Sequence, residues 1–286
     1  MKDFYHIAGI SRAPIYSPNN VDNDGAIFLA VLQCLEAMGH QVRVYQEDDL
    51  LQDAVQEKYI FDMVRSSEAV TKLQELEKFG VVAVNSGFGI ENCRREQMTL
   101  LFHQYGVPQP ESEVCDLEHS PIGVKSNGLS WVKRADGHTV QPNDVVFVAQ
   151  PVDLSRVLDD FRKRDISRVV ISQHQPGDLL KFYGVAGTSF FHWFYPSLAN
   201  HSKFGLEEIN GAPSGYAFAA DQLQTICTKA ATVLGVDVYG GDAVISTDGT
   251  ISIIDFNDWP SFAPCRLEGA KAIAQAIIQK IEREEI

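Results

Sequence analysis

"ISIIDFNDWP", residues 251–260, places Asp255 and Asn257 at the end of an apolar run that contains Ile253 and Ile254. A carboxylate beside buried residues is costly unless a cation or hydrogen-bond donors meet it. The segment before it, "VYGGDAVISTDGT", ends in an Asp-Gly pair between two apolar runs, which is a strong hairpin signal. We therefore expect residues 238–257 to form an antiparallel hairpin that ends in an acidic site.

The hairpin predicts which residues face one another. If Asp248 and Gly249 are the two turn residues, Asp242 lies opposite Asp255, and Gly240 lies opposite Asn257. Two facing carboxylates need a proton or a cation between them, and two carboxylates with an amide oxygen suit Mg²⁺ or Mn²⁺. Gly240 would then leave space for a phosphate. The alternative is a set of solvated polar residues at a strand end, and a β-bulge would change the register.

Two lysines interrupt apolar runs upstream of the hairpin. Lys133 lies in "SWVKRADG" and Lys181 in "GDLLKFYGV". Either lysine alone can extend its amine to solvent from a strand. Taken together, and with a carboxylate hairpin downstream, they are interpreted as point-charge contacts to phosphate.

Composition restricts the class of protein. The chain has 286 residues, 45% of them hydrophobic, and 24 basic against 38 acidic residues give a net charge of −14. This charge opposes nucleic acids and anionic membranes, and no apolar stretch approaches the roughly 20 residues that span a bilayer. The five scattered cysteines never form C-x-x-C, and the start "MKDFYHIAGISR" does not resemble a secretion signal, so we expect a cytoplasmic protein.

Three segments are expected along the chain. Residues 1–110 alternate strand and helix patterns, as an α/β domain does, and a helix over 91–105 ends at Gly106 before "VPQP". Residues 111–185 are rich in strand patterns with one helix near 154–165. Residues 186–286 contain a helix over 217–234, the hairpin and a closing helix from about 265.

These motifs resemble the ATP-grasp superfamily over most of the chain. The similar segments are "VNSGFGIENCRREQMTLLFHQYGVPQPES", "VVISQHQPGDLLKFYGV" and "GGDAVI…DGTISIIDFNDWP". The lysine spacing is closest to the ribosomal-protein glutamate ligase and inositol polyphosphate kinase branches. The family's glycine-rich flap is not evident in "RADGHTVQPND". The resemblance implies an α/β fold, α+β in the C-terminal part, with a Rossmann-like N-terminal domain.

The resemblance also assigns the nucleotide and metal residues. It implies that Asp242, Asp255 and Asn257 bind Mg²⁺ or Mn²⁺, and that the "SQH" hinge offers backbone groups to adenine. Lys181 would contact the β- or γ-phosphate, and Arg95 would replace the nucleotide lysine that the family often has. The full set implied for ATP is Arg95, Lys133, Ser172, Gln173, His174, Lys181 and Lys203, the last in a lid "HSKFGLEEING".

The implied reaction phosphorylates a carboxylate so that an amine displaces phosphate, which makes Lys181 and Arg266 the catalytic candidates. Substrate candidates are Ser11 and Arg12, because open α/β sheets bind ligands at the carboxyl ends of strands, and Arg266, which can clamp an anion. Arg12 in a solvated loop and Arg266 in an ordinary helix turn are the alternatives. Small-molecule substrates are the expected partners, without nucleic acid or membrane, and a homodimer is left open.

Two competing functions remain at this point. A small-molecule kinase of the inositol-phosphate type would transfer the phosphoryl group to a hydroxyl, and it would need a densely basic acceptor pocket. A nucleotide-binding protein without turnover would have kept the fold alone, although intact Asp242, Asp255 and Asn257 speak against it.

Overall fold

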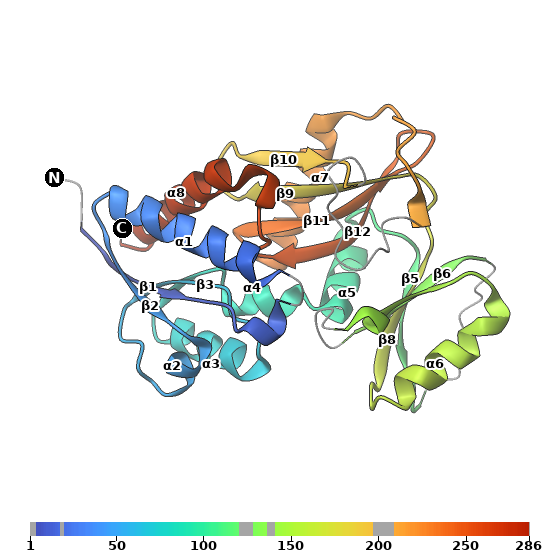
Figure 1. The fold of residues 1–286 in the computed structure, drawn as a ribbon, viewed down its shortest axis with the longest axis horizontal. Helices are drawn as coiled ribbons and strands as arrows, with labels where there is room; N and C mark the ends of the chain where they lie inside the picture. The colour runs from blue at the N-terminus through green and yellow to red at the C-terminus, as the bar shows by residue number, and fades with distance from the viewer. Residues whose placement is uncertain (1–3, 18–19, 120–127, 136–140, 197–208, 286) are drawn as a thin grey trace.

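The computed structural model describes residues 4–17, 20–119, 128–135, 141–196 and 209–285. Its strands form three four-stranded sheets, which lie as three groups in Figure 1. The expected α/β class is therefore confirmed. No helix within the described ranges is long and apolar enough to cross a membrane.

The N-terminal sheet is parallel and has the order β2-β1-β3-β4. Its strands alternate between two cores: Ala8 and Ile10 pack with α2 and α3, whereas Ile7 and Phe61 pack with α1 and α8. The elements are β1 (His6–Ile10), α1 (Val21–Ala37), β2 (Gln41–Tyr45), α2 (Glu47–Leu51), β3 (Tyr59–Asp62), α3 (Ser67–Lys78) and β4 (Val82–Val84).

The helix expected over 91–105 is two helices. α4 (Gly87–Asn92) ends before Arg94, whose backbone is extended with ψ 139°, and α5 (Arg95–Tyr105) starts directly after it. α5 ends at Gly106 with φ 61°, as predicted. The break places Arg95 in the first turn of α5.

The central sheet is antiparallel, with the order β5-β8-β6-β7, and α6 packs against it. Its apolar face and the apolar stripe of α6 share one core, which includes Val132, Leu158, Phe161 and Val169. The elements are β5 (Ser112–Asp116), β6 (Ser130–Arg134), β7 (Val145–Val148), α6 (Leu154–Arg162) and β8 (Arg168–Gln173).

The C-terminal sheet is antiparallel, with the order β10-β9-β11-β12, and α5 and α7 cover one face of it. Its elements are β9 (Asp178–Val185), β10 (Phe191–Phe194), α7 (Ala220–Leu234), β11 (Val238–Ile245), β12 (Ile251–Asp258) and α8 (Arg266–Glu284). β9 pairs with β11, so the strand just before the expected boundary at 185 shares a sheet with the C-terminal strands. The boundaries at 110 and 185 stay a prediction.

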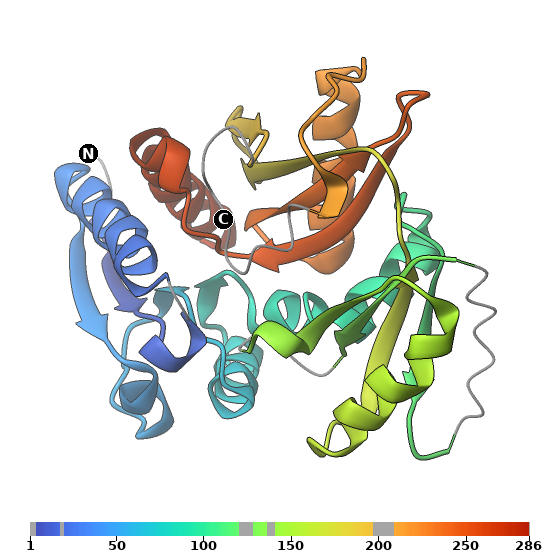
Figure 2. The same ribbon diagram turned by 45° about the vertical axis from the view of Figure 1, so that its right-hand side comes forward.

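The last helix packs against the N-terminal part of the chain. α8 packs beside α1, and the two helices run side by side in Figures 1 and 2. One core therefore contains Phe61 of the N-terminal sheet, Ile273 of α8, Tyr183 of β9 and Trp259 after β12. This shared core fixes the acidic hairpin against the N-terminal sheet.

The hairpin differs from the predicted one in two places that compensate. The turn has three residues, because Ser246 and Thr250 are joined by a backbone hydrogen bond of 2.9 Å and Gly249 adopts φ 82°. A β-bulge then leaves Ile254 without a partner, between the pairs Ala243–Ile253 and Asp242–Asp255. The bulge restores the predicted register at Asp255 and beyond.

Candidate functional site

One cavity of about 330 Å³ lies among the three sheets. Its walls come from the loops after β1 and β3, the start of α5, and strands β6, β8, β9, β11 and β12. Most of the predicted site residues line it: Arg12, Arg95, Lys133, Ser172, Gln173, His174, Lys181, Asp242, Asp255 and Asn257.

Three charged residues lie side by side across the C-terminal sheet. Asp242 pairs with Asp255 on one side and with Lys181 on the other. Lys181 Nζ lies 2.9 Å and 3.3 Å from the two carboxylate oxygens of Asp242. Asn257, two residues beyond Asp255, lies opposite Gly240 as predicted. Lysine thus neutralises the first of the two facing carboxylates.

Asp255 is neutralised from another direction. Its side chain is 25% exposed, and Arg95 Nε lies 3.8 Å from its carboxylate. Burial alone would raise the pKa of Asp255, but the charges of Arg95, Lys133 and Lys181 and a hydrogen bond from Asn257 together hold it below its usual value. Asp255 is therefore ionised at neutral pH, as a metal ligand requires.

Lys133 has a contact that its strand position did not predict. Its Nζ donates a 2.7 Å hydrogen bond to the carbonyl oxygen of Ile254, the bulge residue. Burial and the nearby Arg95 guanidinium lower the pKa of Lys133, against the opposite effect of Asp255 and Asp242. Lys133 thus stabilises the bulge that brings Asp255 into register, and it also lines the cavity.

The expectation that Gly240 leaves room for a phosphate is wrong. A Cβ at this position would meet Phe182 O, Pro260 Cγ and Tyr183 Cδ1, each at 2.7 Å. The loop after β12 turns back over the strand, so glycine is required here by protein packing rather than by a ligand.

The expected adenine hinge offers less of its backbone than predicted. The N–H of Gln173 donates to Glu111 O at 2.8 Å, and the N–H of His174 donates to Leu129 O at 2.9 Å. Trp131 Nε1 donates to His174 Nδ1 at 3.1 Å, and burial lowers the pKa of His174, so its ring is neutral. The hydroxyl of Ser172 is bonded to Ser112. The side chains still line the cavity.

Of the three predicted substrate residues, only Arg12 lines the cavity. Arg12 lines the cavity but pairs with Asp24 at 2.9 Å. Burial, with the nearby Arg65, lowers the pKa of Arg12. Ser11 bonds Gln46 at 3.0 Å and Arg266 bonds Asn23 at 2.8 Å, and neither lines the cavity. Lys203 lies outside the described residues.

The donors at the hairpin fit a hard divalent cation. Two carboxylates face each other on one side of the sheet, with the Asn257 amide beside them. In the part of the chain that the structure describes, no group of three or more His, Cys, Asp or Glu side chains forms a metal cluster. The amide of Asn257 and ligand oxygens would therefore have to complete the coordination.

The chain resembles known proteins in structure and not in sequence. No family model matches the chain, and no curated protein matches it by sequence. Solved structures match over almost its whole length. D-alanine–D-alanine ligase from Bacillus anthracis, complexed with ATP, is 12% identical with a TM-score of 0.68, covering 98% of this chain and 99% of that one.

Two further structures carry the superfamily's name. A RimK domain ATP-grasp protein from Sphaerobacter thermophilus is 16% identical, with a TM-score of 0.69 and coverage of 96% and 99%. The ATP-grasp ligase PsnB, complexed with a minimal precursor, is 16% identical, with a TM-score of 0.60 and coverage of 96% and 98%. The chain has the ATP-grasp fold. The resemblance in the sequence motifs is thereby confirmed at the level of fold.

The ion pair of Arg65 and Asp258 in this cavity was not predicted from the sequence. Arg65 follows β3 and forms an ion pair with Asp258, the last residue of β12, and both line the cavity. Asp258 lies within "DFNDWP", so the motif itself held a signal. Arg65 follows the apolar segment "YIFDMV", and only the tertiary fold shows what it contacts.

The charges that line the ATP-grasp cavity differ from those of the whole chain. The chain carries −14, whereas the cavity has more basic than acidic side chains. The described lining has five basic residues and four carboxylates, namely Arg12, Arg65, Arg95, Lys133 and Lys181 against Asp24, Asp242, Asp255 and Asp258. The cavity is therefore the part of an acidic protein that suits an anionic ligand with a divalent cation.

Proposed function

We propose that this protein is an ATP- and Mg²⁺-dependent ligase that joins a carboxylate to an amine through an acyl phosphate. The observation that carries the proposal is the row of Lys181, Asp242 and Asp255 across one sheet, with Arg95 and Lys133 beside it, in a single cavity. The fold supports it, because similar structures are named as ligases and one of them holds ATP.

The metal would be held by Asp242, Asp255 and Asn257. Bound there, Mg²⁺ or Mn²⁺ would neutralise phosphate charge and orient the phosphates of the nucleotide for transfer. A cation on Asp242 competes with Lys181 Nζ, which now lies 2.9 Å from that carboxylate. Lys181 would turn to the phosphates, and Arg95 beside Asp255 would do the same from the other side.

The chemistry needs no nucleophilic side chain. A substrate carboxylate oxygen attacks the γ-phosphorus, the bond to the β-phosphate oxygen breaks, and ADP leaves. The amine nitrogen then attacks the acyl carbon, inorganic phosphate leaves, and the nitrogen loses a proton. Lys181 and Arg95 would stabilise the charge on the transferred phosphoryl group, and closely placed reactants would supply much of the rate.

The kinase alternative receives less support from the cavity. Four of its five basic side chains contact a carboxylate of the same cavity within 4.0 Å, and the fifth, Lys133, donates to a main-chain carbonyl. A densely basic acceptor pocket, which a polyphosphate acceptor would need, is not provided by these residues.

The test is an acceptor screen. Purified protein is incubated with ATP, Mg²⁺ and pools of amino acids, amines and polyols, and ADP release and product masses are measured. A product that combines an acid and an amine with loss of water is expected. A mass gain of one phosphoryl group on a hydroxyl compound would support the kinase instead, and nucleotide binding without turnover would refute both enzymes.

A matched pair of variants tests the site. Asp255→Asn removes a carboxylate of the proposed metal site, and we expect it to abolish ADP release. Asp237→Asn removes a carboxylate of similar exposure, 29%, which pairs with Lys280 outside the cavity. Turnover should survive Asp237→Asn, and equal loss in both variants would contradict the site.

A further inference from the structure

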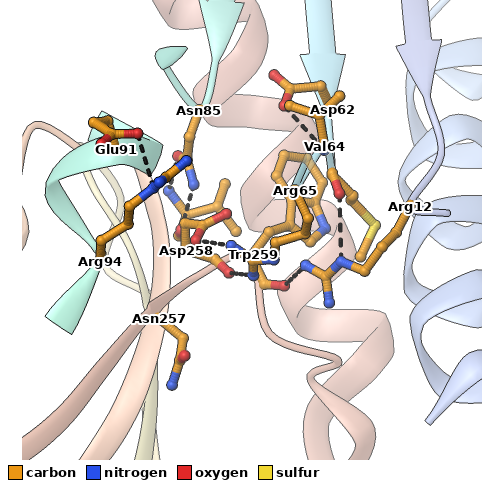
Figure 3. Close-up of polar contacts among 12 residues, drawn as sticks. Arg12, Asp62, Val64, Arg65, Asn85, Glu91, Arg94, Asn257, Asp258 and Trp259 are labelled. Carbon is orange, nitrogen blue, oxygen red and sulfur yellow. Dashed lines mark hydrogen bonds and ion pairs between the residues drawn. The ribbon is translucent and has the colours of Figure 1, made fainter. Parts of the chain in front are cut away.

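Three polar side chains directly beyond the strands of the N-terminal sheet contact the main chain of the acidic hairpin. They are Arg12 after β1, Arg65 after β3 and Asn85 after β4 (Figure 3). Each donates a hydrogen bond to a residue more than 150 positions away in the sequence. Open α/β sheets usually bind ligands at this edge, but these residues bind protein.

Arg65 and Arg12 contact consecutive residues. Arg65 Nη2 donates to the carbonyl of Asp258 at 2.7 Å, while Nη1 forms the ion pair with its carboxylate. Arg12 Nη2 donates to the carbonyl of Trp259 at 2.9 Å, and its Nε donates to Met63 O at 3.3 Å. Because the guanidinium is a rigid fork, such paired contacts fix the direction of the main chain as well as its position.

Asn85 fixes the neighbouring strand. Its amide nitrogen donates to Val238 O at 2.7 Å, and its oxygen accepts from the N–H groups of Asp237 and Val238 at 2.8 Å each. Asn85 is fully buried. Trp259 N also donates to Val238 O, at 3.0 Å, so both strands of the hairpin meet in one network.

We propose that Arg65, Arg12 and Asn85 are positioning residues for the metal ligands, and this inference rests on the proposed function. Asp255 and Asn257 lie three residues and one residue before Asp258 on β12. The bulge at Ile254 interrupts the regular pairing between the turn and Asp255. The turn alone therefore does not fix the position of Asp255 along the strand. The hydrogen bonds from Arg65, Arg12 and Asn85 fix the end of the hairpin that lies away from the turn. They contact Asp258, Trp259 and Val238, respectively.

This assignment gives Arg12 a different role from the substrate contact expected from the sequence. Its guanidinium is balanced by Asp24 and contacts two main-chain carbonyls, as that of Arg65 is balanced by Asp258. Both arginines thus act on the reaction through the segment that carries Asn257, and the position of this segment decides the metal geometry.

The structure contains a matched control. Arg164 donates to Asn143 O at 2.8 Å and pairs with the buried carboxylate of Asp144, which repeats the contact pattern of Arg65 in the central sheet region. It does not line the cavity. Lysine at either position keeps the charge but loses the fork, so Arg65→Lys and Arg164→Lys should lose comparable stability.

The test measures Mn²⁺ affinity in the presence of a non-hydrolysable ATP analogue, together with the unfolding midpoint. We expect Arg65→Lys to weaken Mn²⁺ binding about tenfold or more, as is typical when a group that orients the metal ligands is lost. Arg164→Lys should bind Mn²⁺ as the wild type does. If Arg65→Lys does not fold, Arg12→Lys takes its place, with the same expected loss.

Unchanged Mn²⁺ affinity in a folded Arg65 or Arg12 variant would overturn the inference while leaving the proposed function intact. Equal loss in Arg164→Lys would also overturn it, because the effect would then follow stability alone. Wild-type protein that binds no Mn²⁺ with the analogue would overturn the proposed function, and the inference with it.

Discussion

Replacement of Lys181 by methionine should change metal and nucleotide affinity in opposite directions. Lys181 Nζ is bonded to both oxygens of Asp242, at 2.9 Å and 3.3 Å, with the side chains 15% and 23% exposed. A divalent ion that binds Asp242 without nucleotide must break this contact. Lys181→Met removes the competitor and nearly keeps the length of the side chain, so Mn²⁺ alone should bind more tightly.

The magnitude follows from the contact. A hydrogen bond to a charged group contributes about 1.5–3 kcal/mol, and partial exposure places this one at the lower end. Because about 1.4 kcal/mol corresponds to a factor of ten, Mn²⁺ affinity should rise roughly tenfold. ATP affinity should fall by a similar factor, because Lys181 no longer meets the phosphates. Unfolding free energy should drop by about 1–2 kcal/mol as Asp242 loses its partner.

The assay is titration calorimetry with Mn²⁺ alone, then with an ATP analogue at saturating Mn²⁺. Lys280→Met is the control, because Lys280 forms a comparable pair with Asp237 at 2.6 Å, with side chains 27% and 29% exposed, outside the cavity. It should lower stability and leave both affinities unchanged. Weaker Mn²⁺ binding in Lys181→Met would refute the displacement argument.

Three further outcomes are expected. Gly240→Ala should cost about 1–3 kcal/mol in urea unfolding, since its Cβ would lie 2.7 Å from three atoms. Burial raises the pKa of Asp62 well above its usual value, so the folded state keeps a proton that the unfolded state loses, and stability falls as pH rises from about 4 towards the folded-state pKa. Asp62→Asn should remove this fall in urea unfolding measured at a series of pH values above about 4. Ser11→Ala should leave nucleotide affinity unchanged, because Ser11 bonds Gln46 outside the cavity.

The facing pair at Asp242 and Asp255 was predictable, although the turn was not. Period-two alternation and the Asp-Gly signal were enough to place both carboxylates on one face. The predicted two-residue turn was one residue short, and the bulge at Ile254 compensated. Lys133 donates a hydrogen bond to the carbonyl of the bulge residue, Ile254, from another sheet. A contact at such a distance along the chain leaves no local pattern.

The residues that hold the hairpin could not be predicted from the sequence either, because their contacts are also distant along the chain. Arg65 and Asn85 follow buried strands and look like ordinary loop residues until the fold brings them to Asp258 and Val238. Gly240 shows the converse. Its type was noticed, but the atoms that require it come from Pro260 and from β9. The sequence pattern of a strand predicts which of its side chains share a face. The residues that pack on that face come from distant segments, so the pattern does not predict them.

Under the proposed function, an acidic chain would bind an anionic nucleotide because basic side chains are already held at the site by carboxylates. Each of Lys181 and Arg95 is held by a carboxylate that a metal ion would bind, Asp242 and Asp255 respectively. Metal binding would therefore free Lys181 and Arg95 to contact phosphate, and nucleotide binding would in turn draw them away from the metal ligands. Because each ligand lowers the cost of the other, nucleotide and metal should bind cooperatively. The local excess of one basic residue then suffices, despite a net charge of −14.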